Sequence, residues 1–165
     1  MHTILVPTDF TADCDLAFQI ACNIARDQDC EIIVLHIVRP DNCSKQDLDG
    51  DEIDHDSTLY QSCWDRFARL QVLASDIPLS FQVKVGPLVE TMIDVADAEH
   101  CDAIVLAAHP HCYLHRQIYG SVSQSLARRC RCPVVCLSPP GFQQEPASLA
   151  SGMGQEVLAK TVVSH

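Results

Sequence analysis

The sequence lacks any run approaching the ~20 apolar residues that a membrane-spanning helix needs, so we expect no association with a membrane. It also lacks a basic lead and a cleavage-type site around its first apolar segment, His2–Val6, which argues against a signal peptide. A cytoplasmic location is the resulting expectation. The ten cysteines are scattered along the chain, so we expect reduced thiols rather than a disulfide scaffold.

Catalytic constellations are also missing. The sequence shows no nucleophile–base pair, paired-carboxylate signature or metallohydrolase motif, which predicts that the protein is not an enzyme. The spacing Asp47-x-Asp49-x-Asp51 begins like a calcium-binding loop. Such a loop needs glycine at its sixth position and glutamate at its twelfth, where this chain has Glu52 and Thr58, so we expect no calcium site.

Positive charge is scarce overall. Eleven lysines and arginines against 22 acidic residues give a net charge of −11, which argues against general nucleic-acid binding. No acidic residue lies between 103 and 144, however, and that segment contains Arg116, Arg128, Arg129 and Arg131. It is therefore either a locally basic surface or, for the last three arginines, the ordinary positive end of a helix.

Short apolar runs and amphipathic segments alternate along the chain. The runs predict strands at 2–6, 31–38, 79–85, 103–107 and 133–137, and helical spacing predicts helices ending near 26 and covering 58–74, 88–100 and 121–130. Residues 39–56 are irregular and rich in acidic side chains, which predicts a solvated loop insertion. Residues 141–165 are rich in Gln, Ala, Ser and Gly and predict a flexible tail after a domain at 1–140.

This alternation predicts an α/β fold with three layers, α/β/α, around a parallel sheet. Five strands commonly take the order 3-2-1-4-5 or 2-1-3-4-5, and ligands bind where the order reverses. In the first order, the loops after 2–6 and 103–107 meet at that point. The second loop ends at Gly120-Ser121 before a helix, and a helix N-terminus offers unpaired amides to an anion.

Four fragments resemble the universal stress protein (Usp) family, as a single UspA-type domain. They are I-L-V-P-T-D-F-T at 4–11, V-L-H-I-V at 34–38, G-S-V at 120–122 and C-P-V-V at 132–135. The resemblance spans roughly residues 1–139 and implies an adenine nucleotide alpha hydrolase-like fold with strand order 3-2-1-4-5. It also implies dimerisation, for which the last strand, Val134–Leu137, is the expected site.

One branch of this family binds ATP through a loop of the form G-x-x-G-x₉-G-S/T, together with residues after the first two strands. The resemblance therefore implies a nucleotide site formed by Pro7, Thr8, Asp9, Ile37, Ala107, His109, Gly120, Ser121, Val122 and Ser123. The first two loop glycines fall on Ala107 and Pro110. Proline has no amide hydrogen to donate, and one donor missing from a phosphate oxygen costs on the order of 1.5–3 kcal/mol. We thus expect weakened binding of ATP, ADP or AMP, with magnesium only beside a triphosphate.

Two further functions stay open. A Usp domain without nucleotide would act as a dimeric module for a protein partner that the sequence does not identify, and an ATP-hydrolysing enzyme has the least support. His109, His111, Cys112 and His115 are zinc-ligand types, but their spacing matches no recognised motif, so an exposed loop without metal is expected.

Three residue groups are interpreted as structural. Near the last strand, we expect the thiols of Cys130, Cys132 and Cys136 to belong to the core. We interpret His36 as a hydrogen-bonded core histidine. Trp64, the single tryptophan, is expected to pack on its helix.

Overall fold

A computed structural model describes residues 2–49, 52–107 and 121–137. Five strands form the main sheet: β1 (His2–Pro7), β2 (Cys30–Val38), β5 (Leu79–Val85), β6 (Ala103–Ala107) and β7 (Val134–Leu137). Its order is β5-β2-β1-β6-β7, with every pairing parallel. Counted along the chain within this sheet, that order is the expected 3-2-1-4-5. The structure differs from the predicted fold in one detail: it contains a second sheet, made of two short strands.

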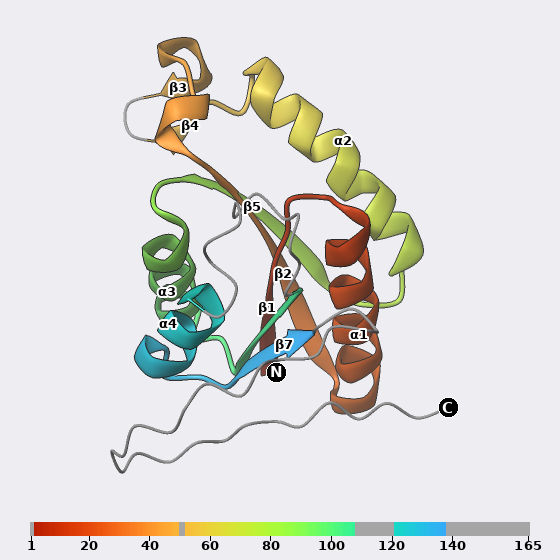
Figure 1. The fold of residues 1–165 in the computed structure, drawn as a ribbon. Helices are drawn as coiled ribbons and strands as arrows, with labels where there is room; N and C mark the ends of the chain where they lie inside the picture. The colour runs from red at the N-terminus through yellow and green to blue at the C-terminus, as the bar shows by residue number, and fades with distance from the viewer. Residues whose placement is uncertain (1, 50–51, 108–120, 138–165) are drawn as a thin grey trace.

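Two pairs of helices cover the two faces of the sheet (Figure 1). They are α1 (Ala12–Gln28), α2 (Thr58–Leu73), α3 (Leu88–Ala98) and α4 (Ser121–Arg129). The apolar side chains divide accordingly into two clusters. Ile4 and Val6 of β1 pack with α1 and α2, whereas Leu5 packs with α3 and α4. Alternate residues of a strand point to opposite faces, so the central strand supplies both cores and reads as an unbroken apolar run. The α/β/α prediction is confirmed.

The acidic segment 39–56 is more ordered than the sequence indicates. It contains two short 3-10 turns, Pro40–Asn42 and Lys45–Asp47, and a small antiparallel hairpin of β3 (Leu48–Asp49) and β4 (Glu52–Ile53). Ser44 and Asp47 cap the second turn reciprocally, and Ile53 is buried. Most described side chains of the segment are exposed, as expected of a solvated insertion. The expectation that it is irregular is wrong, because the capped turn, the short hairpin and the burial of Ile53 give it local structure.

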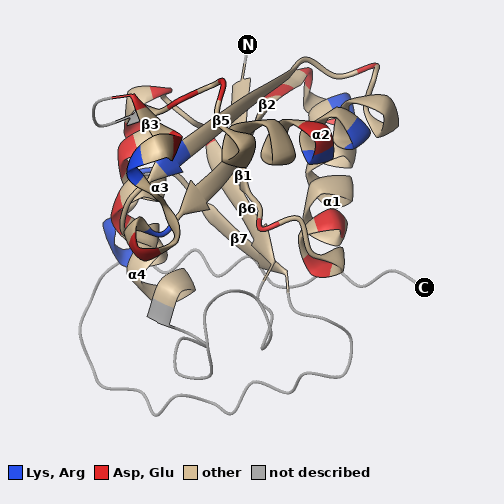
Figure 2. Cartoon of the chain, turned by 90° about the horizontal axis from the view of Figure 1, so that it is seen from above, with Lys and Arg blue, Asp and Glu red and all other residues tan. Residues whose placement is uncertain are grey.

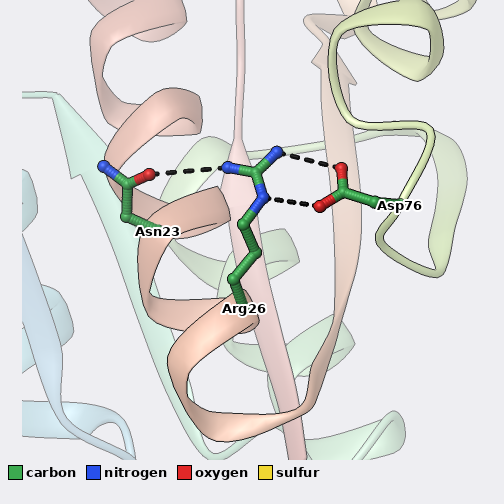
Figure 3. A network of polar contacts seen from close by, with 3 residues as sticks. All are labelled: Asn23, Arg26 and Asp76. Atoms are coloured by element: carbon green, nitrogen blue, oxygen red, sulfur yellow. Dashed lines mark hydrogen bonds and ion pairs between the residues drawn. The ribbon is translucent and has the colours of Figure 1, made fainter.

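An exposed ion pair ties the end of α1 to the turn before β5. The Arg26 guanidinium donates through Nε and Nη2 to both carboxylate oxygens of Asp76, at 2.6 and 3.0 Å, and through Nη1 to Asn23 Oδ1 at 3.5 Å (Figure 3). The hydrogen bond from Arg26 lowers the pKa of Asp76. Both side chains are solvent-exposed. This ion pair therefore orients the end of α1 relative to the turn before β5 and contributes little to the free energy of unfolding.

Stability should depend on the aromatic core under α2 rather than on such surface pairs. Phe67 is 1% exposed, and its ring stacks on Phe81 with the ring centroids 4.7 Å apart. Replacing a buried phenylalanine by alanine costs about 3–5 kcal/mol, so Phe67→Ala should lower the free energy of unfolding by that amount in urea denaturation. Val72→Ala on the same helix removes a 78% exposed side chain and should change it by less than about 0.5 kcal/mol. Equal losses in the two variants would contradict the placement of α2.

Candidate functional site

The sheet order reverses between β1 and β6. These strands lie side by side and parallel, with Ile4 opposite Ala103 and Leu5 opposite Ile104. The chain leaves β1 toward α1 on one face, whereas the helix that follows β6, α4, lies on the other face (Figure 1). The carboxyl ends of β1 and β6 therefore form the topological switch point, where ligands bind in open α/β sheets. This is the position that the sequence predicts.

The loop after β1 is held by hydrogen bonds from its own residues and from β2. The Thr8 amide donates to the Leu35 carbonyl at 2.8 Å, and the Phe10 amide donates to Thr8 Oγ1 at 2.9 Å. His36 Nδ1 lies 2.8 Å from the Thr8 carbonyl. Since a carbonyl oxygen only accepts, the Nδ1–H of His36 must donate this bond. These hydrogen bonds therefore fix the loop at the carboxyl end of the central strand.

Asp9 organises the start of α1. Its Oδ1 accepts from the Thr11 amide at 3.0 Å, from Thr11 Oγ1 at 2.6 Å and from Cys14 Sγ at 3.1 Å. Asp9 Oδ2 belongs to the same half-buried carboxylate and is itself shielded from solvent. Asp9 thus fixes the turn that precedes α1, whose N-cap is Thr11, and is also a candidate ligand contact. A variant that removes Oδ1 would disturb both roles.

His36 is neutral at physiological pH. Burial lowers its pKa and outweighs the hydrogen bond to Thr8 and the negative charge of Asp9, which both raise it, while the positive charge of Arg66 lowers it further. The prediction that His36 is hydrogen-bonded is confirmed, but its side chain is only partly buried and belongs to neither apolar cluster. The bond that it donates fixes the residue before Asp9.

Phe10 lies in the loop after β1 that borders the switch point, and its backbone conformation is not predicted by the sequence. Its backbone has φ 61°, a left-handed conformation that non-glycine residues rarely adopt. Its ring centroid lies 5.2 Å from that of His36, and the Arg66 guanidinium carbon lies 5.8 Å from the ring centroid. Such strain persists only where neighbours hold it, and here these two side chains do so. Only Asp, Asn or Gly would have indicated the conformation in advance.

The expected nucleotide residues fall into four groups, the last of which is Ser121, Val122 and Ser123 at the beginning of α4. Pro7, Thr8 and Asp9 lie together at the switch point, with Ala107 at the end of the adjacent β6. Ile37, near the end of β2, is buried against the face of the sheet that α3 and α4 cover. His109, Pro110 and Gly120 lie outside the described residues, and so do the zinc-type side chains His111, Cys112 and His115.

The first three residues of α4, Ser121–Ser123, have different roles. Ser121 is the first residue of the helix. Val122 is buried with the side chains of α3 and β6, and the Ser123 hydroxyl hydrogen-bonds to Cys136 of β7. Val122 therefore serves the core. Ser123 joins α4 to the last strand, which leaves its backbone amide rather than its hydroxyl as the group to offer a ligand.

The cysteines of this region are structural thiols. None of the nine cysteines that the structure describes forms a disulfide. Burial raises the pKa of Cys101 to about 12 and that of Cys130 to about 11, and the nearby Cys132 thiol adds to both shifts. Burial likewise raises the pKa of Cys132 and Cys136. The thiolate is the reactive form, so these cysteines are poor nucleophiles at neutral pH.

Within 2–49, 52–107 and 121–137, no group of three or more His, Cys, Asp or Glu side chains is arranged to hold a metal ion. None of the helices in those ranges is long and apolar enough to cross a membrane.

Solved structures with the same fold include several universal stress proteins. UspA from Lactobacillus plantarum has 24% identity and a TM-score of 0.65, over 82% of this chain and 97% of its own. A universal stress protein in complex with cAMP has 20% identity and a TM-score of 0.62, over 82% and 96%. One from Archaeoglobus fulgidus in complex with dAMP has 15% identity and a TM-score of 0.59, over 82% and 97%. At these identities the likeness shows the fold alone.

The family of the chain is shown by its sequence. No curated protein matches the chain. The model of the universal stress protein family, however, matches residues 1–138, which include every element of the main sheet and all four helices. The chain belongs to the universal stress protein family.

Proposed function

We propose that this protein is a regulatory universal stress protein that binds an adenine nucleotide at the switch point, with reduced affinity for a triphosphate. The observation that carries the proposal is the meeting of the Pro7–Asp9 loop with the end of β6. That loop is fixed by the His36 and Leu35 hydrogen bonds before any ligand arrives. A preformed site avoids the cost of ordering a loop on binding.

The preference for fewer phosphates rests on the chain after β6. Ala107 and Pro110 occupy the places of two glycines, so the first half of the phosphate loop offers fewer close amide donors. The helix start at Ser121–Ser123 keeps its backbone amides for one anionic group. The related structures named as complexes with cAMP and dAMP carry a single phosphate each, which supports the same preference.

A second candidate function is a Usp domain that acts through protein contacts without nucleotide. Two observations favour it: Asp9 Oδ1 is already engaged by α1, and the Ser123 hydroxyl is engaged by Cys136. We propose under either function that the chain acts in the cytoplasm, without catalysis, and as a homodimer through β7. That strand pairs only with β6 in the described sheet, and an edge strand offers unpaired amides and carbonyls.

Restoring a glycine should reveal the cost of the altered loop. Pro110→Gly supplies an amide donor near the phosphates, so ATP affinity measured by calorimetry should rise about tenfold to a hundredfold. AMP affinity should change by less than about threefold, since its single phosphate sits at the helix start. Pro140→Gly, beyond the last strand, is the matched control and should change neither affinity.

The same titrations separate the two functions. Micromolar ATP affinity in the unmodified protein, unchanged in Pro110→Gly, would show that the proline does not limit binding. No heat of binding for ATP, ADP or AMP in either protein would leave the partner-binding module as the function.

Asp9 should contribute to nucleoside binding through its second carboxylate oxygen, as a hydrogen-bond acceptor. Asp9→Asn keeps an oxygen for Thr11 but replaces the second carboxylate oxygen by an amide that cannot accept. Adenosine and AMP affinities should therefore fall together, by about tenfold or more. The urea midpoint should change little. Asp15→Asn, exposed in the first turn of α1, is the control for loss of one charge. A drop in that control as large as in Asp9→Asn would assign the effect to net charge.

A further inference from the structure

The left-handed residue Phe10 lies between the candidate site and the first helix. Asp9, which the proposed function assigns to the nucleoside, precedes it, and Thr11, the N-cap of α1, follows it. The amide and the hydroxyl of Thr11 both donate to Asp9 Oδ1, at 3.0 and 2.6 Å. The backbone of Phe10, with φ 61°, sets the direction in which the Thr11 amide points. The orientation of the Asp9 carboxylate therefore depends on the conformation of Phe10.

A phenylalanine in this unfavourable conformation needs neighbours that hold its ring. The Phe10 ring centroid lies 5.2 Å from that of His36 and 6.2 Å from that of Phe81. The third neighbour is Arg66 of α2, whose guanidinium carbon lies 5.8 Å from the Phe10 ring centroid. This distance is within the ~6 Å over which the face of an aromatic ring attracts a cation. Side chains from β2, β5 and α2 therefore surround the Phe10 ring.

Arg66 differs from the other two neighbours in being exposed. His36 and Phe81 are partly buried, and Phe81 packs against the apolar cluster under α1 and α2. Figure 2 shows basic positions on α2, which lies on the same side of the sheet as α1. Among the described residues Arg66 forms no ion pair, so its charge is available to the ring. Arg66 can consequently be replaced without opening a cavity in the core.

We propose that Arg66 is a positioning residue of the nucleotide site: its guanidinium holds the Phe10 ring, and the ring holds the turn that presents Asp9. This role rests on the proposed function, because it concerns the affinity of that same site. Arg66 acts through Phe10 and not by contact with the ligand. The exposed side of α2 is thereby coupled to the loop after β1, so a change on α2 alters ligand affinity while every residue of the site stays the same.

Removal of the charge tests this role. A cation above an exposed aromatic ring contributes a factor of about twofold to fivefold, so Arg66→Gln should lower the affinities for adenosine and AMP together by that factor in calorimetry. Arg66→Lys keeps a cation and should retain the affinity of the unmodified protein. Arg69→Gln, one turn along α2 and also exposed, is the matched control for a lost charge and should change neither affinity. The urea midpoint should stay in place in all three variants.

A second substitution separates positioning from direct contact with a phosphate. Glycine adopts the left-handed conformation without a ring to hold it, so Arg66→Gln should cause no further loss of affinity in the Phe10→Gly background. Such non-additivity is expected where one residue acts through another. An Arg66 that contacted the phosphate would behave differently: its replacement would lower AMP affinity in both backgrounds and leave adenosine affinity unchanged. That result would overturn the proposal.

Amide hydrogen exchange measures the turn without any nucleotide. The Phe10 amide donates to Thr8 Oγ1 and the Thr11 amide to Asp9 Oδ1, and both bonds belong to the same turn. Exchange of these two amides should accelerate by about twofold to fivefold in Arg66→Gln, whereas amides within β1 should not change.

The two measurements have different failures. Unchanged exchange of the Phe10 and Thr11 amides in Arg66→Gln, or an adenosine affinity equal to that of the unmodified protein, would overturn the role of Arg66 alone. Absence of binding of both adenosine and AMP to the unmodified protein would instead overturn the proposed function, and the role of Arg66 in binding with it.

Discussion

The pairing of β1 between β2 and β6 is the constraint on which the rest of this structure depends. Six residues of β1 are in register with β2, from His2 opposite Cys30 to Pro7 opposite Leu35. Each face of β1 supplies a different apolar cluster, so a slip by one residue would move every side chain of the strand into the opposite cluster. Side chains hold the strand at both ends. At its start, the Thr3 amide donates to the Asp102 carboxylate at 2.8 Å, and at its end His36 donates to Thr8.

This constraint explains why the fold follows from the sequence. The strands buried on both faces are short apolar runs that local patterning detects, and alternation with amphipathic helices leaves few parallel topologies. The acidic segment 39–56 could not be predicted in the same way. Its order comes from a cap between Ser44 and Asp47 and from the burial of Ile53, whereas composition alone favours a solvated loop. Trp64 is expected to pack on its helix, and it does so on one side only: its ring lies 5.4 Å from that of Phe67, centroid to centroid, while 40% of the residue is exposed.

The candidate site was predictable in position and only partly in construction. Topology places Asp9 at the switch point from the strand order alone. The use of its Oδ1 by Thr11 and Cys14, the left-handed Phe10 and the Ser123–Cys136 contact depend on tertiary neighbours that no local pattern contains. Residues in the loop and at the helix start therefore stabilise the fold and also form the candidate site. For this reason, Asp9 and Ser123 must be tested with substitutions that preserve the shape of the side chain.

The two edges of the sheet differ in a way that bears on aggregation. On the β5 side, Pro78 precedes the strand, Gly86-Pro87 follows it, and Lys84 lies near its end. Proline and lysine are residues that keep a foreign strand from adding to an edge. β7 has only four residues and no charged side chain. During synthesis or partial unfolding, uncontrolled growth of the sheet by strand addition is consequently blocked at one margin and restricted to a short template at the other.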